Sequence, residues 1–383
     1  MSKPKVLIPF KTHVDLAKHL ADWNCLNADI DFIEYKITSK DDFKAYLKTS
    51  DIVCLWITDE LCTFWDEPTC FFDDFPASLK LIAVPWVGTD FLDVSKLRSE
   101  KNITVCNIGP HAAGSVAEIA LQLTLSCFRM TSFFEHCFRF VHTGQCLKCF
   151  DYVGGTKHAP HQTPALRGGA SYLFPEPLSM EQSQDSQQNS AFTIAGKSIN
   201  STAGKTALIL GFGYIGQTIG KKLHHGLDMS IRYYKRSGPV SSEILGYPAE
   251  YCDSLKDPKT WAAADLVVLA LPGDASTSNI VNHETLSFCK DGVRIVNVGR
   301  GSCIDEEALL AALESGKVCS AGLDVYKNEG TKVDPRFFDR WDVTLLPHIG
   351  SAISEMISMQ TSVTLNNIED VLLKNGSGLY PVN

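Results

Sequence analysis

The chain has 383 residues, of which 44% are apolar and 21% are charged, and its formal net charge is −9. This length and apolar content suffice for two domains with separate cores. An acidic chain without a basic stripe is not expected to bind nucleic acid or an anionic membrane. The N-terminus leads directly into a strand pattern without the apolar region of a signal peptide, and no apolar run reaches transmembrane length, so we expect a soluble, cytoplasmic protein.

The cysteine content favours reduced thiols. There are thirteen cysteines, an odd number. Most lie within apolar patterns, as do Cys54, Cys106, Cys127 and Cys319. Buried thiols of a reducing compartment fit this distribution better than a disulfide framework does.

The first 106 residues alternate strand patterns with helical or polar connections. This alternation predicts a parallel α/β domain. The turn at 86–90 follows a strand, and ligands bind beyond the carboxyl ends of strands in open α/β sheets. Its backbone N–H groups are therefore candidates for binding a carboxylate. The candidate strands are 5–10, 31–35, 52–57, 79–84 and 103–106.

A long apolar helix is predicted to begin at Ser115. Ser115 and Glu118 have the spacing of a capping box, and apolar residues continue to Phe138. A helix this apolar must be buried. We interpret it as the crossing into a second domain and as part of a subunit interface.

Residues 142–203 interrupt the alternation because they are rich in Gly, Pro, Ser and Gln. We predict a mobile insertion at about 146–200. It contains Cys146, Cys149, His158 and His161, residue types that bind zinc. Only eight residues separate Cys149 from His158, fewer than in a usual zinc finger, so we expect no metal, with a zinc site as the open alternative.

A glycine loop follows the insertion. Residues 206–210 predict a buried strand, and Gly211, Gly213 and Gly216 follow with G-x-G-x-x-G spacing before a helical pattern. Gly211 would form the tight turn, Gly213 would admit a pyrophosphate, and Gly216 would let the helix approach the strand. The free N–H groups at the helix N-terminus would face the phosphates. A structural glycine turn is the alternative.

The next strand pattern, 229–234, ends in Lys235, Arg236 and Ser237. An NAD site would carry Asp or Glu here for the ribose 2′-hydroxyl. Two cations and a hydroxyl suit a 2′-phosphate instead, which favours NADP(H) with NAD(H) possible. The alternative is that these residues form only a solvated turn.

The alternation then resumes to the end of the chain. Strands are predicted at 266–271, 294–298, 318–325 and 343–346, and a helix is predicted between Asp305 and Gly316. The carboxyl ends of parallel strands share one edge of a sheet. The sequence therefore predicts one crevice that receives Lys235, Pro272, Arg300, Asp324 and His348.

Three residues of this set and its neighbourhood suit hydride transfer to a 2-oxo acid. Arg300, between two glycines, offers a planar fork of donors for a carboxylate and the adjacent carbonyl. His348 is the candidate proton donor near neutral pH. Glu329 is expected to bind the imidazole and raise its pKa, which keeps the imidazolium populated. Each residue also has an ordinary structural alternative, and the joint arrangement favours the catalytic interpretation.

At this point the chain resembles the D-isomer-specific 2-hydroxyacid dehydrogenases. The resemblance rests on the glycine loop at 211–216, Asn-Val-Gly-Arg-Gly at 297–301, Gly-Leu-Asp-Val-Tyr-Lys-Asn-Glu at 322–329, Pro-His-Ile-Gly-Ser at 347–351 and the final Tyr-Pro-Val-Asn. Residues 233–237 resemble those of glyoxylate and hydroxypyruvate reductases that prefer NADPH. The segments cover nearly the whole chain except the insertion.

The resemblance implies a fold and a set of roles. The expected fold class is α/β with two doubly wound parallel sheets, a flavodoxin-like substrate domain of residues 1–106 and 351–383 and a Rossmann dinucleotide-binding domain of residues 107–350. It implies that Arg300 binds substrate, that His348 is the acid/base and that Glu329 tunes it. It further implies that Val87 and Gly88 donate backbone N–H groups to the substrate carboxylate, and that the protein is a homodimer through the dinucleotide-binding domain. Asp324 would orient the nicotinamide carboxamide. The expected cofactor-binding residues are Gly211, Gly213, Tyr214, Ile215, Gly216, Lys235, Arg236, Ser237, Pro272, Val298, Asp324 and His348.

The predicted function is therefore NAD(P)H-dependent reduction of a small-molecule 2-oxo acid to a D-2-hydroxy acid. The alternative is a non-catalytic dinucleotide sensor that presents a surface to protein partners, as in corepressor relatives of the family. Oxidation of formate or phosphite on the same frame ranks lower, because formate-oxidising relatives have Gln where Glu329 stands. Trp56 and Trp86 either line the substrate pocket, which would favour a branched or aromatic substrate, or belong to the core.

Overall fold

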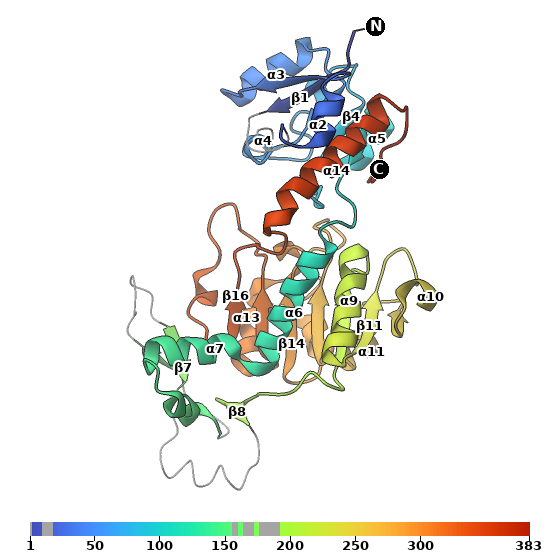
Figure 1. Ribbon diagram of the computed structural model, residues 1–383. Coiled ribbons are helices and arrows are strands. Elements are labelled where there is room, and N and C mark those ends of the chain that lie inside the picture. The colour runs from blue at the N-terminus through green and yellow to red at the C-terminus, as the bar shows by residue number, and fades with distance from the viewer. Residues whose placement is uncertain (1, 10–17, 155–159, 164–171, 176–191) are drawn as a thin grey trace. The chain divides into compact units, whose positions relative to one another are not determined.

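A computed structural model describes residues 2–9, 18–154, 160–163, 172–175 and 192–383 (Figure 1). The chain divides into two compact units. The first unit combines Met1–Ala112 with Ser351–Asn383, and the second is Ala113–Gly350. Among the described residues, no helix is both long enough and apolar enough to cross a bilayer.

The first unit contains a five-stranded parallel sheet. Its order is β2-β1-β3-β4-β5, the flavodoxin-like order. β1 and β3 to β5 consist almost entirely of buried apolar residues, as expected of strands covered on both faces. The strands are β1 (Lys5–Pro9), β2 (Asp31–Tyr35), β3 (Cys54–Trp56), β4 (Leu81–Ala83) and β5 (Thr104–Cys106).

Helices cover both faces of this sheet, with a separate apolar cluster on each face. The C-terminal residues extend the sheet, since the Val382 N–H donates to the Val105 carbonyl oxygen over 2.9 Å. The Asn383 side chain accepts from the Val105 N–H over 2.9 Å, which holds the chain end along β5. The helices are α2 (Ala21–Leu26), α3 (Lys40–Thr49), α4 (Asp59–Cys62), η1 (Phe72–Asp74), α5 (Val94–Lys101) and α14 (Ser354–Leu372).

The second unit contains a seven-stranded parallel sheet of order β12-β11-β10-β13-β14-β15-β16. Its first six strands follow the Rossmann order 3-2-1-4-5-6. The strand order reverses between β10 and β13, where dinucleotides bind in such sheets. Both sheets confirm the predicted fold class. The strands are β10 (Thr206–Leu210), β11 (Ser230–Tyr234), β12 (Ala249–Cys252), β13 (Leu266–Leu269), β14 (Val293–Asn297), β15 (Val318–Leu323) and β16 (Val343–Leu345).

Two layers of helices enclose this sheet (Figure 1). α6 (Ala113–Arg129) and α9 (Tyr214–Leu227) pack together on one face, and α11 (Pro258–Ala262), α12 (His283–Phe288) and α13 (Glu306–Ser315) lie on the other. The predicted ends of α13 are confirmed, because Asp305 caps its N-terminus and Gly316 ends it with a φ of +78°. The remaining short elements are α10 (Ser242–Leu245), η4 (Gly301–Cys303) and η5 (Pro335–Phe337).

The predicted capping box on α6 is wrong. The helix begins at Ala113, so Ser115 lies buried within its first turn rather than at the N-cap. The Glu118 carboxylate pairs instead with the Lys222 ammonium of α9 over 3.0 Å. The long helix also stops at Met130, whose φ of +52° breaks it into separate segments.

After Met130 the chain forms a small layer that we call the arm, residues 130–154 and 192–200. It contains α7 (Thr131–His136), a π-helical turn (Cys137–Val141), a 3₁₀ helix (Cys146–Tyr152), β8 (Thr193–Ile194) and β9 (Lys197–Ser198). Both ends of the predicted insertion therefore pack in one apolar cluster, which includes Phe133, Cys149 and Ile194. A further hairpin joins β6 (Pro160–Thr163) to β7 (Tyr172–Pro175), and the rest of the predicted insertion lies outside the described residues.

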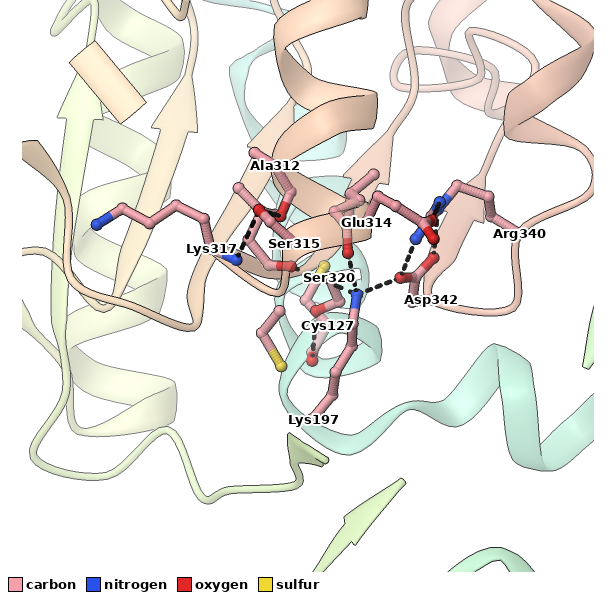
Figure 2. Close-up of polar contacts among 12 residues, drawn as sticks. Cys127, Lys197, Ala312, Glu314, Ser315, Lys317, Ser320, Arg340 and Asp342 are labelled. Atoms are coloured by element: carbon pink, nitrogen blue, oxygen red, sulfur yellow. Dashed lines mark hydrogen bonds and ion pairs between the residues drawn. The ribbon is translucent and has the colours of Figure 1, made fainter. Parts of the chain in front are cut away.

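Buried charges attach the returning end of the arm to the second unit (Figure 2). Lys197 pairs with Asp342, whose side chain is 0% exposed, and donates to the Leu313 carbonyl oxygen over 2.8 Å. Arg340 binds the same carboxylate over 2.7 Å. Burial raises the pKa of Asp342, but these two cations outweigh burial and hold the pKa below its usual value. The Lys197–Asp342 pair thus attaches the arm to the second unit, and Arg340 helps to hold Asp342 in position.

Candidate functional site

The glycine loop joins β10 to α9, and its three glycines differ in the space around them. Gly211 has a φ of +89°, and a Cβ there would lie 2.5 Å from the Ala270 carbonyl oxygen. A Cβ on Gly216 would lie 2.0 Å from the Gly211 carbonyl oxygen. Both positions therefore exclude any side chain.

Gly213 differs, because a Cβ on it would meet no atom within 4 Å. Packing within the protein does not require glycine at this position. Gly213 is the N-cap of α9, so the first N–H groups of a 14-residue helix are directed past it. An open glycine in front of a helix N-terminus fits a dinucleotide pyrophosphate, which needs close backbone approach.

The three residues after β11 lie at the same edge of the sheet. Lys235 is half-buried, and Arg236 and Ser237 are exposed. The Arg236 guanidinium reaches the loop after β13, where Nη1 lies 3.1 Å from the Ser276 Oγ and 3.4 Å from an Asp274 carboxylate oxygen. Sequence reasoning missed Asp274, because no motif links it to a residue of another strand.

Arg300 follows β14, and both neighbouring glycines are sterically required. A Cβ on Gly299 would lie 2.7 Å from the Leu271 carbonyl oxygen. A Cβ on Gly301 would lie 1.8 Å from the Tyr326 carbonyl carbon. Three strand ends thus meet closely around Arg300, whose Nη1 donates to the Gly299 carbonyl oxygen over 2.8 Å.

His348 and Glu329 form the predicted pair. His348 Nδ1 lies 2.8 Å from Glu329 Oε2. The other carboxylate oxygen, Oε1, accepts the Tyr326 N–H over 2.7 Å, which orients the carboxylate. Since Nδ1 is occupied, Nε2 is the nitrogen left for a substrate proton.

The pair shifts both pKa values in the direction that a proton donor needs. The hydrogen bond to Glu329 raises the pKa of His348 above its usual value despite partial burial. Burial alone would raise the pKa of Glu329. The hydrogen bonds from His348 and from the Tyr326 N–H outweigh burial, so the pKa of Glu329 lies below its usual value. The positive charge of Arg300 lowers both pKa values, which places the guanidinium within electrostatic range of the pair.

Asp324 holds the turn that presents His348. Its carboxylate oxygens accept the Ile349 and Gly350 N–H groups over 2.8 and 2.9 Å. Asp324 is only 1% exposed, and His348 has a φ of +55°, a conformation that a residue other than glycine adopts only when its surroundings enforce it. Asp324 therefore positions the imidazole, and its role toward the nicotinamide carboxamide stays a prediction.

An apolar cavity of about 400 Å³ adjoins the pair. Both residues of the pair, Glu329 and His348, line the cavity, and Arg300 is not among its lining residues. Its lining is Tyr326, Glu329, Val333, Phe338, Leu345, Leu346, Pro347 and His348.

In the first unit, the predicted carboxylate-binding turn follows β4. Val87 is held through its carbonyl oxygen, which accepts from Asn107 Nδ2 over 2.8 Å. Among the described residues, the Val87 and Gly88 N–H groups have no acceptor. Trp56 belongs to the core, whereas Trp86 is partly exposed and packs near Phe91 with ring centroids 6.2 Å apart.

The other predicted residues vary in exposure. Tyr214 is 61% exposed on the first turn of α9, Ile215 is half-buried, Pro272 is exposed and Val298 is buried. Within the described ranges, no group of three or more His, Cys, Asp or Glu residues is arranged to hold a metal ion. His158, one of the four candidate zinc ligands, lies outside those ranges.

Comparisons with known proteins identify similar chains. Residues 178–350 match the family model described as "D-isomer specific 2-hydroxyacid dehydrogenase, NAD binding domain". A candidate 2-hydroxyacid dehydrogenase of Saccharomyces cerevisiae is 48% identical over 386 aligned residues, which cover 100% of this chain and 97% of the relative.

Two solved structures extend the similarity to both units. A glyoxylate reductase from Paecilomyes thermophila is 25% identical with a TM-score of 0.77, covering 100% of this chain and 98% of that one. An NADPH-dependent glyoxylate/hydroxypyruvate reductase from Sinorhizobium meliloti, solved with NADP and malonate, is 25% identical with a TM-score of 0.69. That alignment covers 100% of this chain and 97% of the other.

Proposed function

Because the chain belongs to the D-isomer specific 2-hydroxyacid dehydrogenase family, we propose that it reduces a 2-oxo acid to a D-2-hydroxy acid with a nicotinamide dinucleotide. One observation carries this proposal. The His348–Glu329 pair, with Nδ1 and Oε2 2.8 Å apart, lies at the carboxyl edge of the sheet whose β10 ends in the glycine loop, within electrostatic range of Arg300. A proton donor, a carboxylate-binding cation and a dinucleotide loop are the components that such a reduction requires.

Each residue has a defined step. The dinucleotide, when bound, supplies the hydride. Arg300 binds the substrate carboxylate and polarises the adjacent carbonyl, because its fork carries several N–H donors. His348 donates the Nε2 proton to the carbonyl oxygen as negative charge develops there, and Glu329 stabilises the imidazolium before transfer. The Val87 and Gly88 N–H groups are the proposed further donors to the substrate carboxylate.

The cofactor that we propose is NADP(H) in preference to NAD(H). The residues after β11, Lys235, Arg236 and Ser237, carry two cations and a hydroxyl and no acid. Such a group binds the 2′-phosphate of NADP(H), whereas a carboxylate would bind the ribose 2′-hydroxyl of NAD(H). The Sinorhizobium meliloti relative, whose structure contains NADP, supports the same choice.

We further propose a cytoplasmic homodimer that associates through the second unit. Phe138, Leu147 and Phe150 of the arm are 43%, 84% and 54% exposed, an apolar surface typical of a subunit contact. The thirteen cysteines are all free, which fits a reducing compartment. Sedimentation of the purified protein would test the dimer, and a monomer at micromolar concentration would contradict it.

The proposed reaction is tested by following NADPH and NADH oxidation with the purified protein. The substrates are glyoxylate, hydroxypyruvate, pyruvate, 4-methyl-2-oxopentanoate, phenylpyruvate and benzoylformate, and chiral chromatography assigns the product where it has a stereocentre. We expect turnover of at least one acid to the D-product, with a higher kcat/KM for NADPH. An L-product, or no turnover with any of the acids, would overturn the proposal.

A further inference from the structure

The loop after β13 contacts both ends of the predicted dinucleotide site. A Cβ on Gly273 would lie 3.1 Å from Arg300 Cγ, so the start of this loop packs against the catalytic end. The next residue, Asp274, lies 3.4 Å from Arg236 Nη1 at the end predicted for the adenosine. The loop therefore places one carboxylate directly beside the cation assigned to the 2′-phosphate.

The sheet order shows what this contact spans. Arg236 follows β11 and Asp274 follows β13, and these strands flank β10 on opposite sides. The Arg236–Asp274 contact thus crosses the carboxyl end of β10, where the glycine loop begins. A dinucleotide bound at that loop must place its adenosine half beside this contact.

Asp274 is held firmly in this position. Its Oδ1 accepts the Ser276 N–H over 2.8 Å as well as the Ser276 hydroxyl. Its own N–H donates to Thr277 Oγ1 over 2.9 Å, and Thr277 is 5% exposed. The hydrogen bonds from Ser276, followed by the charge of Arg236, hold the pKa of Asp274 below its usual value, so the carboxylate is ionised at neutral pH.

We infer that Asp274 is a specificity-determining residue that competes with the 2′-phosphate of NADP(H) for the Arg236 guanidinium. This inference rests on the proposed function, because it assigns the choice of cofactor at the same site. The Asp274 carboxylate holds Arg236 Nη1 and offsets the guanidinium charge, so a 2′-phosphate gains more from Arg236 when the Asp274 contact weakens. NADH carries no 2′-phosphate, so its binding leaves the Arg236–Asp274 contact intact. Asp274 thereby limits the preference for NADPH that the two cations create.

The expected size of the effect follows from exposure. The Arg236 and Asp274 side chains are 73% and 40% exposed, so water screens their attraction. An exposed pair of this kind changes affinity by about two- to fivefold. Asp274→Asn keeps the size of the side chain and an acceptor for the Ser276 N–H while it removes the charge. We expect it to tighten NADPH binding by about two- to fivefold and to leave NADH binding unchanged.

Binding is measured by titration calorimetry with 2′,5′-ADP and 5′-AMP, and by fluorescence titration with NADPH and NADH. The nucleotide pair isolates the 2′-phosphate and requires no turnover. The charge-matched control is Asp291→Asn, since Asp291 forms an exposed pair with Lys317 over 2.9 Å just before β14, at the opposite edge of the sheet. Thermal unfolding of each variant verifies that the fold is intact. Asp274→Ser serves as a second substitution that removes the same charge.

A double-mutant cycle with Arg236→Ala isolates competition from plain repulsion. Competition predicts that Asp274→Asn tightens 2′,5′-ADP in the wild-type background and has no effect in the Arg236→Ala background. An equal gain in both backgrounds, or no gain in either, would overturn the inference. So would wild-type protein that binds NADH and not NADPH. Failure to bind any dinucleotide would instead refute the proposed function itself.

Discussion

Replacing Glu329 with Gln tests the proton-donor assignment through the pH dependence of the reaction. The substitution removes the negative charge 2.8 Å from His348 Nδ1 and keeps the shape of the side chain. The two side chains are 50% and 35% exposed, so the dielectric of water is the appropriate reference. Two unit charges at this distance in water attract by about 1.5 kcal/mol, which equals about one pH unit.

The direction follows from the sign of the shift. Glu329 raises the pKa of His348, so the imidazolium persists to higher pH in the wild type. In Glu329→Gln the pH at which kcat/KM for reduction falls by half should move down by about one unit. Oxidation of the hydroxy acid needs the neutral imidazole. The pH at which kcat/KM for oxidation reaches half its maximum should therefore also move down by about one unit.

The assay is kcat/KM in both directions between about pH 5 and about pH 9. Glu306→Gln is the matched control, because Glu306 accepts the Lys327 N–H over 3.1 Å in the same region and does not contact His348. A midpoint that stays in place in Glu329→Gln, or that moves equally in Glu306→Gln, would refute the pairing as the cause of the raised pKa.

Two further predictions concern the glycine loop and the arm. Gly216→Ala should lower the free energy of unfolding, because its Cβ would lie 2.0 Å from a carbonyl oxygen. Gly213→Ala should keep a free energy of unfolding in urea within about 1 kcal/mol of the wild type. The same variant should bind NADPH at least tenfold more weakly, because its Cβ would obstruct the pyrophosphate. Equal losses of stability would contradict this division. Asp342→Asn should destabilise the second unit by about 3 kcal/mol, because it leaves the buried Lys197 ammonium without its carboxylate and leaves Arg340 with Glu314 alone. Lys197→Met, which leaves Arg340 on the Asp342 carboxylate, should cost less. The pKa of Asp342 is lowered on folding, so its contribution to stability is present above the unfolded pKa and is lost as the pH falls through the folded pKa. The pH midpoints of acid unfolding of the wild type and Asp342→Asn check this prediction. Identical midpoints would contradict it.

The elements most accurately predicted from sequence are those whose signals are local. The bounds of β10 were predicted correctly because its apolar run ends at a glycine loop, and Asp305 and Gly316 mark α13 with their own capping chemistry. β12 was missed because Ala249–Cys252 is a short edge strand with mixed polarity. Pairing of His348 with Glu329 was predicted correctly because both follow strands of one sheet edge.

The errors have a common physical origin, since side chains distant in sequence decide them. Ser115 and Glu118 have capping-box spacing, yet α6 starts two residues earlier and Glu118 binds Lys222 of another helix. Asp274 meets Arg236 only because β11 and β13 flank β10. In both pairs the two residues are far apart in sequence, so no local sequence pattern predicts the contact.

The central claim is that His348 donates the proton in a reduction carried out by this protein. The most direct test compares wild type and His348→Ala for both NADPH binding and 2-oxo acid reduction. We predict that the variant binds NADPH within about threefold of the wild type and loses at least a thousandfold in kcat, the order expected for a general acid. Unchanged kcat in the variant would contradict the assignment. NADPH binding by the wild type without turnover of any 2-oxo acid would instead favour a dinucleotide sensor.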